Sequence, residues 1–176
     1  SGYADETACI DSLRRVFGVH SVCPAVRMPA DDFGAVCEQA ADMLSGMAGT
    51  FKVVARRADK RYIMDTPQIN AEIGAYILEK VPQLRVDVHS PEHVLNVEIR
   101  DQALLYAPVI PAVGGLPTGS AGKATLLLSG GIDSPVAGFR VAKRGVELSA
   151  VYFHSFPYTG EPAKEKVLSL ARILSE

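Results

Sequence analysis

The sequence is poor in the features that define secreted, membrane-bound and strongly basic proteins. Its 176 residues include only three cysteines, Cys9, Cys23 and Cys37, and no two of them have CxxC spacing. This odd number argues against a disulfide framework and indicates a reducing, cytoplasmic location. We expect all three cysteines to be buried structural residues.

Long apolar runs and a large net charge are also absent. No run approaches the roughly 20 residues that a membrane helix needs, and Ser1 to Glu6 lack the basic and apolar parts of a signal peptide. We therefore expect a soluble protein with no membrane partner. The formal net charge is only −2, so any contact with nucleic acid must come from a local patch. His20, His89 and His93 have no Cys or His at ligand spacing, so no zinc site is expected.

Hydrophobic residues make up 48% of the chain, enough for one or two cores. Within residues 1–28, apolar side chains recur at helical spacing from Ala8 to Phe17, and an extended stretch follows from Ser21 to Met28. This pair of elements cannot bury its apolar face alone. It must pack against another part of the molecule, and we treat residues 1–28 as a separate segment.

Residues 29–110 have the pattern of an α+β domain. Helical periodicity follows Asp31-Asp32, which offer an N-cap, and resumes after Thr66-Pro67, since proline suits the first turn of a helix. Alternating or continuous apolar residues predict strands at 51–57, 84–88, 95–99 and 104–110. The order helix, strand, helix and then three strands predicts an antiparallel or mixed sheet covered by helices.

The remainder of the chain has a different composition and a different pattern of apolar residues. Residues 111–123 are rich in Gly and Pro and are expected to be a linker. The apolar run Ala124 to Leu128 predicts a strand covered on both faces. A helix to Arg144, a strand at 146–153 and a helix at 162–174 follow. Residues 124–176 therefore resemble the opening of an α/β doubly wound sheet, which two strands alone do not complete, so we expect the domain to be cut off at Glu176.

The loop from Ser129 to Ser134, with the sequence SGGIDS, carries the strongest chemical signal. Gly130 and Gly131 allow the backbone to approach a ligand and to present its N–H groups to it. Ser134 is expected to be the N-cap of the following helix, whose N-terminus would favour an anion. A carboxylate at Asp133 would repel phosphates unless a cation intervened, so a bound Mg²⁺ is expected. The alternative is an ordinary glycine turn before a capped helix.

These motifs together resemble a known family. The stretch from Leu127 to Ala137 is similar to the PP-loop of the N-type ATP pyrophosphatases, and more narrowly to the tRNA 4-thiouridine synthetase (thiamine-biosynthesis sulfurtransferase) family. Upstream, Phe51-Lys52-Val53 and Glu72-Ile73-Gly74 resemble the THUMP RNA-binding domain of that family. Three further segments match it: the lead-in Gly114 to Lys123, Lys143 to Val146, and Phe153 to Ser155.

The resemblance implies a domain order. Residues 1–28 would be the remnant of an N-terminal ferredoxin-like domain, 29–110 the THUMP-like domain, and 124–176 a truncated PP-loop domain. The family's catalytic acid and persulfide-handling cysteine have no counterpart before Glu176. The chain would thus be an inactive fragment of the enzyme.

The resemblance also implies an activity and a set of ATP-binding residues. Family members adenylate a tRNA uridine with ATP, release pyrophosphate and replace the oxygen with sulfur, and they are linked to thiamine biosynthesis. It further implies a cysteine desulfurase as sulfur donor and a homodimer in the full-length protein. The expected ATP-binding residues are Leu127, Leu128, Ser129, Gly130, Gly131, Asp133, Ser134, Tyr152 and Phe153, with Asp133 also contacting Mg²⁺. The leucine and aromatic pairs have an alternative role as ordinary core strand residues.

A basic strip in the α+β domain is the candidate contact for tRNA. Five basic residues stand against the single Asp59, and such a strip can neutralise phosphates. Its alternative is a solvated strand end. Tyr62 could stack on an unpaired base. The basic residues are Lys52, Arg56, Arg57, Lys60 and Arg61.

Other functions compete with this interpretation. A different PP-loop enzyme, such as an amidotransferase-type synthetase or a tRNA lysidine synthetase, would share the loop but not the basic domain. An RNA-binding module without activity is the second alternative. A Walker P-loop is excluded, since Pro117 and Ala124 occupy positions that need Gly and Ser or Thr. His154 could contact a nucleotide or be a surface residue.

Overall fold

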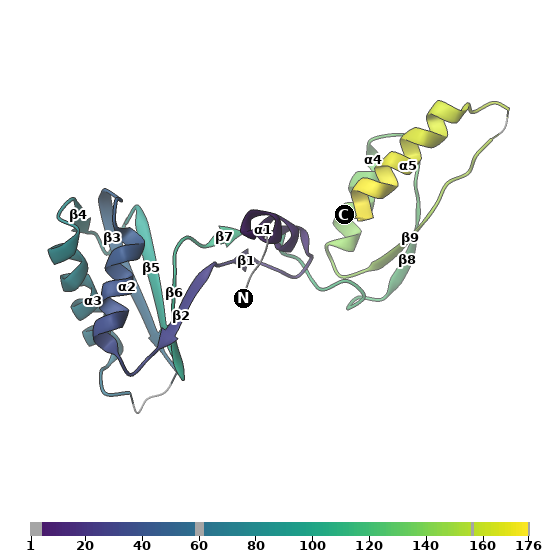
Figure 1. The fold of residues 1–176 in the computed structure, drawn as a ribbon. Helices are drawn as coiled ribbons and strands as arrows, with labels where there is room; N and C mark the ends of the chain where they lie inside the picture. Colours follow the sequence, from purple (N-terminus) through teal and green to yellow (C-terminus); the bar gives the residue numbers. More distant parts are fainter. Residues whose placement is uncertain (1–4, 59–61, 156, 176) are drawn as a thin grey trace. The chain divides into compact units, whose positions relative to one another are not determined.

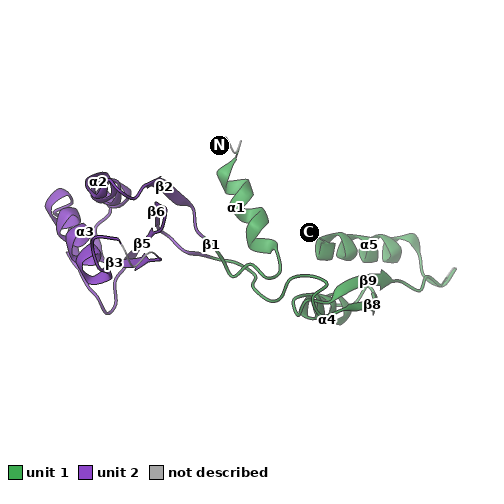
Figure 2. Cartoon of the chain, turned by 90° about the horizontal axis from the view of Figure 1, so that it is seen from below, with its two compact units in different colours: residues 1–22, 111–176 green, residues 23–110 purple. Residues whose placement is uncertain are grey.

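A computed structural model describes residues 5–58, 62–155 and 157–175. The chain divides into two compact units, one formed by residues 23–110 and the other by residues 1–22 together with 111–176 (Figure 2). Within the described residues, no helix is both long enough and apolar enough to cross a membrane.

The unit of residues 23–110 is built on a five-stranded mixed sheet. Its strand order is β2-β6-β5-β3-β4, in which β3 runs parallel to β4 and β5 while β6 is antiparallel to β2 and β5. The predicted α+β class and the mixed sheet are therefore confirmed. The strands are β2 (Ala25–Pro29), β3 (Gly49–Arg57), β4 (Leu84–Val86), β5 (His93–Ile99) and β6 (Gln102–Tyr106).

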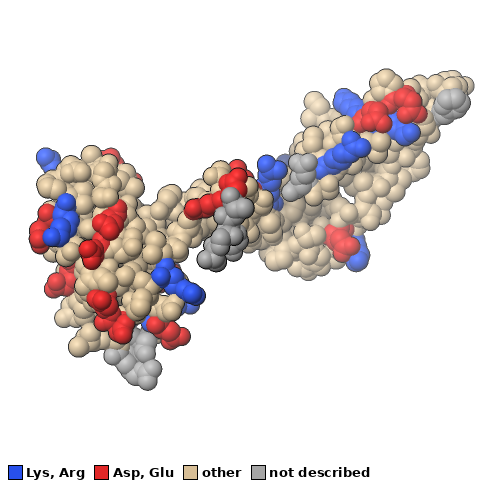
Figure 3. All heavy atoms as spheres, viewed as in Figure 1, with Lys and Arg blue, Asp and Glu red and all other residues tan. Residues whose placement is uncertain are grey.

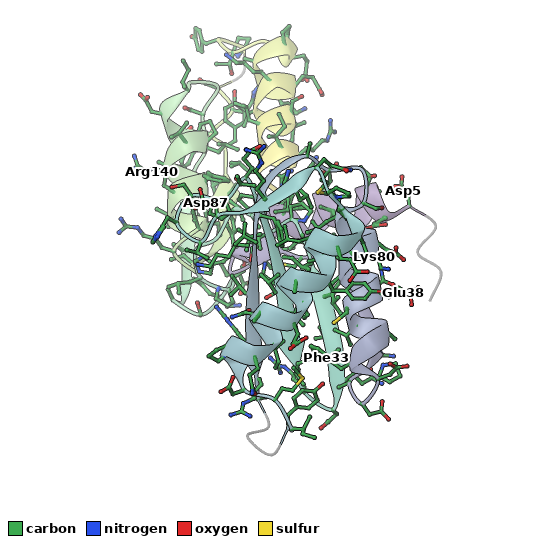
Figure 4. All side chains as sticks on the ribbon, turned by 90° about the vertical axis from the view of Figure 1, so that its left-hand side faces the viewer. Asp5, Phe33, Glu38, Lys80, Asp87 and Arg140 are labelled. Atoms are coloured by element: carbon green, nitrogen blue, oxygen red, sulfur yellow. The ribbon has the colours of Figure 1, made fainter. Side chains whose placement is uncertain are left out.

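Two helices, α2 (Phe33–Leu44) and α3 (Thr66–Lys80), cover one face of this sheet (Figure 1 and Figure 4). The Asp32 carboxylate accepts the Ala35 N–H at 3.0 Å, as the sequence predicts for an N-cap. At α3, Asp65 and Gln68 form a reciprocal capping box. The helices and alternate strand residues enclose one apolar core, whose largest fully buried members are Phe51, Leu44, Ile69, Ile73, Ile77, Leu95, Ile99 and Leu105.

The other unit contains a two-stranded parallel sheet, β8 (Lys123–Leu127) with β9 (Glu147–Val151), and the helices α4 (Asp133–Ala142) and α5 (Glu161–Ser175). This is the predicted β-α-β-α opening. Near the start of the chain lie α1 (Glu6–Arg15) and the short strand β1 (Ser21–Val22), which pairs with β7 (Ile110–Pro111).

Two boundaries differ from those expected from the sequence. Residues 25–28 were grouped with the first segment, yet β2 pairs along its length with β6 and so lies in the five-stranded sheet. Residues 111–123 were expected to be a linker, but their first part is held by backbone hydrogen bonds: Gly114 exchanges bonds with Gly18 and Val19, and Leu116 donates to Lys143. The reason is that extended backbone groups from distant segments satisfy one another.

Two expectations of burial were wrong. The strand at 124–128 was expected to be covered on both faces, but Leu127 is 64% exposed while Leu128 is only 4% exposed. Helices α4 and α5 cover the face of the β8–β9 sheet on which Leu128 lies. The opposite face, on which Leu127 lies, is left largely exposed by the described residues. Of the cysteines, only Cys37 is buried, and burial raises the pKa of its thiol; Cys9 and Cys23 are partly exposed.

Candidate functional site

The SGGIDS loop lies at the carboxyl edge of the β8–β9 sheet. Strand β8 ends at Leu127, the Leu128 N–H still donates to the Val151 carbonyl at 2.9 Å, and α4 begins at Asp133. The loop therefore connects the end of one parallel strand to the N-terminus of a helix. Ligands of open α/β sheets bind at this edge, where the partial positive charge of the helix end favours an anion.

Two serines close this loop on itself. The Ser129 N–H donates to Ser134 Oγ at 2.9 Å, and the two hydroxyl oxygens lie 3.1 Å apart. The Gly131 N–H also points to Ser129 Oγ, at 3.4 Å. The predicted N-cap role of Ser134 is wrong: the N-cap position is Ile132, which provides no side-chain cap, and Ser134 is the second residue of α4. Its hydroxyl is turned towards Ser129. We call the hydrogen-bonded pair Ser129 and Ser134 the serine clasp.

The two glycines of the loop are not required by the fold. Neither Gly130 nor Gly131 has a positive φ. A Cβ built on Gly130 would lie 3.8 Å from Lys166 Cδ, and one on Gly131 would lie 3.5 Å from Ser129 Oγ, both ordinary contacts. Gly145 is different, since its φ is +87° and a Cβ there would lie 3.1 Å from the Pro117 carbonyl oxygen. A methyl group would therefore fit at either position, so neither backbone conformation nor packing in the folded chain requires glycine at 130 or 131.

Asp133 is the only carboxylate in the SGGIDS loop, and its side chain is exposed at the first residue of α4. Among the described residues, no three His, Cys, Asp or Glu side chains gather as a metal site would require. A single carboxylate fits one mode of Mg²⁺ binding, in which the ion takes one or two carboxylates and completes its shell with water and substrate phosphates.

The four residues expected beside adenosine have different environments. Leu127 and Phe153 are 64% and 77% exposed, so in this chain they are not core residues. Leu128 is buried against the helices and Tyr152 is partly buried. Since Leu127 pairs with Val151, the exposed apolar side chains lie at the ends of adjacent strands. They form a surface on which a flat ring could lie.

His154 belongs to the turn after β9. Its Nδ1 lies 3.4 Å from Thr159 Oγ1, and that hydroxyl oxygen also accepts the Ser155 N–H at 3.0 Å. The His154 ring lies 6.0 Å from that of Tyr152. These contacts make His154 part of a closed surface turn.

The expected RNA strip is not a single surface. Successive residues of β3 point to opposite faces of the sheet. Lys52 and Arg56 share the face that α2 and α3 leave open, whereas Arg57 lies on the other side and donates to the carbonyls of Tyr62 and Met64 at 3.1 and 3.0 Å. Lys60 and Arg61 lie outside the described residues.

Two of the remaining residues in this region are already engaged. Lys52 Nζ donates to the Val88 carbonyl at 3.0 Å. The Tyr62 ring packs against the core and its hydroxyl donates to the Ala30 carbonyl at 2.9 Å. The Tyr62 ring is therefore only partly exposed, and the expected stacking on an unpaired base stays a prediction. Among the strip residues that the structure describes, Arg56 is the exposed one.

The open face of the sheet adds arginines that sequence reasoning missed. The register places Arg56 beside Glu98, Glu98 beside Leu104, and Leu104 beside Arg27, so one row crosses four strands. Arg100, just after β5, donates to the Glu98 carboxylate at 2.9 Å. We call Arg27, Arg56 and Arg100 the open-face arginines. Period-two alternation could have identified Arg27, but only the strand order places it in this row.

Electrostatics around Glu98 are set by these neighbours. The hydrogen bond from Arg100 is the main cause that lowers the pKa of Glu98, and the hydrogen bond from the Tyr106 hydroxyl at 3.1 Å also contributes. Burial, with the nearby Glu98, raises the pKa of Tyr106. On the side visible in Figure 3, both signs of charge occur on each unit. Basic side chains are therefore interspersed with acidic ones, which agrees with the net charge of only −2.

Two sequence families match the chain. Residues 31–107 match the family described as the THUMP domain, and residues 119–176 match the family described as thiamine biosynthesis protein (ThiI). Proteins named probable tRNA sulfurtransferase from Lachnospira eligens and Acetivibrio thermocellus are each 49% identical to it. The alignments cover 98% and 93% of this chain but only 45% and 43% of those proteins.

Solved structures agree with these matches. A 4-thiouridine synthetase in complex with RNA and bound ATP superposes with a TM-score of 0.87 at 42% identity, over 97% of this chain and 46% of that one. PH1313 from Pyrococcus horikoshii Ot3 superposes with a TM-score of 0.80 at 29% identity, over 96% of this chain and 55% of that one. The chain thus spans less than half the length of the tRNA sulfurtransferases it matches. With a THUMP match at residues 31–107 followed by a ThiI match at residues 119–176, the chain is similar over nearly its whole length to part of the proteins named tRNA sulfurtransferase.

Proposed function

We propose that this chain contributes the tRNA-binding and ATP-binding portions of a tRNA sulfurtransferase. In this reaction ATP adenylates a tRNA uridine at its C4 oxygen, pyrophosphate leaves, and sulfur replaces the activated oxygen. The proposal extends to this chain what its relatives are named for. We expect the catalytic acid and the persulfide-handling cysteine in the portion of those relatives that the chain does not span.

The observation that carries the nucleotide proposal is the loop at the carboxyl edge of β8. Its glycines are not needed for backbone conformation or packing, so close approach of a ligand is the remaining physical reason for two of them in succession. The serine clasp holds the loop closed in advance, which lowers the conformational entropy lost on binding. The proposed phosphate ligands are Ser129, Gly130, Gly131, Asp133 and Ser134, with Leu127, Leu128, Tyr152 and Phe153 beside the adenosine.

Mg²⁺ is proposed as the cation that makes Asp133 compatible with phosphates. Its chemistry is to neutralise charge on the phosphate oxygens. Asp133 would hold it from the start of α4, and the nucleotide would supply further oxygen ligands. This assignment requires ATP affinity to depend on Mg²⁺ in the wild-type chain and much less in Asp133→Asn.

The tRNA is proposed to contact the open face of the five-stranded sheet. Arg56 and Arg27 are exposed there, and Arg100 adds a third guanidinium beside the single carboxylate of Glu98. Guanidinium groups pair with phosphate in a bidentate manner. Lys52, with Lys60 and Arg61, would extend this surface, whereas Arg57 supports the fold. A cysteine desulfurase as sulfur donor, a homodimer, a link to thiamine biosynthesis and a cytoplasmic location complete the proposal.

Nucleotide binding is tested by titrating the 176-residue chain with ATP, with and without Mg²⁺, while following the amide NMR signals of the loop. The expected result is a saturable shift of Gly130, Gly131 and Ser134 only when ATP is present. Unchanged loop signals at millimolar ATP and Mg²⁺ would contradict the proposal.

The RNA surface is tested by charge reversal at matched positions. Arg27→Glu and Arg56→Glu are expected to weaken tRNA binding and to reduce its dependence on salt, since each removes a phosphate contact. Lys80→Glu at the end of α3 is the control, because it makes the same charge change on the helix side of the sheet. Equal effects of Arg56→Glu and Lys80→Glu would show only a dependence on net charge.

The two experiments together separate the competing functions. An RNA-binding module would bind tRNA through the open-face arginines and show no ATP-dependent shift. A different PP-loop enzyme would bind ATP without needing these arginines for tRNA affinity. The observation that favours the sulfurtransferase is the occurrence of both surfaces in one chain, in the order of the THUMP and ThiI matches.

A further inference from the structure

A lysine occupies the apolar stripe of α5 that faces the SGGIDS loop. Lys166, Leu170 and Leu174 follow one another at four-residue spacing, which places them on one side of the helix. All three line a groove of about 420 Å³ together with Gly130 and Gly131 and with apolar residues of α4. Lys166 thus places a cation in a mostly apolar groove, at the end formed by Gly130 and Gly131 of the loop.

The stem of Lys166 lies directly over the loop. Its Cδ is 3.8 Å from the position of a Cβ on Gly130, and Val167 Cγ2 is 3.9 Å from the same point. Val167 is only 3% exposed, so it anchors this turn of α5 against the unit. The Lys166 stem therefore lies against the loop, and its ammonium group, two bonds beyond Cδ, can reach a ligand bound at the loop.

The charge of Lys166 has no acidic partner in the described part of the chain. Lys164, two residues earlier on the same helix, is different, because its ammonium group forms an ion pair with the Glu161 carboxylate at 3.3 Å. A lysine stem commonly lies along apolar surface while its charge reaches water. Here the nearest polar surface is the loop whose N–H groups and helix N-terminus already favour an anion.

We propose that Lys166 binds the pyrophosphate portion of the nucleotide, as a cation reaching from α5 over Gly130. The inference rests on the proposed nucleotide site and adds a ligand from a second helix. The ammonium group would complement the backbone N–H groups of the loop, and the apolar groove beneath its stem would exclude water from one side of the contact. Lower local dielectric strengthens an ion pair with phosphate.

The experiment compares nucleotides that differ in phosphate number. Dissociation constants for ATP, AMP and inorganic pyrophosphate, each with Mg²⁺, are measured for the wild-type chain and for Lys166→Met, Lys166→Arg and Lys164→Met. Lys166→Met is expected to weaken ATP and pyrophosphate on the order of tenfold, as for the loss of one charge-assisted hydrogen bond at an exposed site. AMP should change less than twofold, and Lys166→Arg should retain most of the affinity for ATP.

The controls make the result decisive. Lys164→Met should bind all three ligands like the wild type, and the melting temperature of Lys166→Met should be unchanged because the side chain is exposed. Wild-type affinity of Lys166→Met for ATP would overturn this inference and leave the proposed site intact. Equal losses for ATP and AMP would also overturn it, since they indicate a structural role. Failure of the wild-type chain to bind any of the ligands would overturn the nucleotide site itself.

Discussion

Some residues of this molecule have a clear role in the fold, whereas others have none and are available to bind a ligand. Gly130, Gly131 and Gly145 are all glycines near turns, yet only Gly145 has a backbone conformation that a side chain would strain. Arg56 and Arg57 are neighbours in sequence, yet Arg57 donates to two backbone carbonyls while Arg56 is exposed. Contacts in the folded chain separate residues needed for stability from residues available for binding.

The glycine comparison predicts opposite effects on stability and binding. Gly130→Ala and Gly131→Ala should keep the wild-type melting temperature and lose most affinity for ATP, since the new methyl groups occupy the space beside the loop. Gly145→Ala should lose roughly 1–3 kcal/mol of stability from strained backbone. Melting curves and ATP titrations of the same samples check this. A Gly130→Ala variant that binds ATP normally would contradict the role given to the loop.

Glu98 predicts a pH-dependent contribution to stability. Its pKa in the folded chain is lowered from its ordinary value of 4.5, chiefly by the hydrogen bond from Arg100. The stabilisation is therefore present above pH 4.5 and is lost as the pH falls through the lower folded pKa. Glu98→Gln should be less stable than the wild type at pH 7, by on the order of 1 kcal/mol because the group is partly exposed.

The difference between Glu98→Gln and the wild type should shrink as the pH falls below 4.5. Denaturant melts at pH 7 and pH 3.5 measure this change. Glu79→Gln, in an exposed ion pair with Lys80, is the control and should differ little from the wild type at pH 7. A pH-independent deficit for Glu98→Gln would contradict the electrostatic explanation.

At the scale of elements, short strands leave backbone groups that other elements must satisfy. Strand β4 pairs with β3 only from Gly49 to Phe51, so the farther part of that β3 edge has no strand partner among the described residues. The Asn70 side chain of α3 accepts the Ala55 N–H there at 2.8 Å. This bond also ties α3 to the sheet whose face it covers.

The Asn70 contact predicts a cost when the acceptor is removed. Asn70→Ala should destabilise the chain by about 1–3 kcal/mol, because a partly buried N–H loses its partner. Asn70→Asp keeps an acceptor oxygen of the same shape and should lose less. Urea unfolding of both variants measures the difference. Equal stabilities of Asn70→Ala and Asn70→Asp would contradict this prediction, because they would mean that water replaces the Asn70 oxygen without cost.

At the scale of the whole molecule, apolar burial is unequal between the two units. The main core lies wholly within residues 30–105. In the other unit the only apolar side chains that are buried, among the described residues, are those of Leu128 and Val167. Stability therefore comes mainly from the unit of residues 23–110, whereas the candidate nucleotide site lies in the less buried one.

This inequality predicts different behaviour for the isolated parts. Residues 23–110 alone should unfold in one cooperative transition, since the segment contains its own core and complete sheet. Residues 111–176 alone should show a broad transition with little cooperativity, because few apolar groups leave water. Circular dichroism melts of both segments check this. A sharp transition for residues 111–176 would contradict the unequal distribution of core.

Local pattern determined the order of the elements and the position of the loop. The two helices that begin after Asp32 and at Thr66-Pro67, the mixed α+β class and the β-α-β-α segment follow from periodicity, caps and turn residues. These signals act within a few residues and need no knowledge of the fold. Period-two alternation alone also separates Arg56 from Arg57, although both are basic neighbours in the expected strip.

Only the tertiary structure decided which residues meet. The Ser134 hydroxyl binds Ser129 and not its own helix end, Arg27 joins the row of Arg56 through the strand order, and Lys166 reaches Gly130 from a helix more than thirty residues later. Such contacts depend on strand order and helix packing over long separations. Propensity and spacing describe a residue's neighbours in sequence, whereas the SGGIDS loop acquires its surroundings from chain segments that the motif itself does not specify.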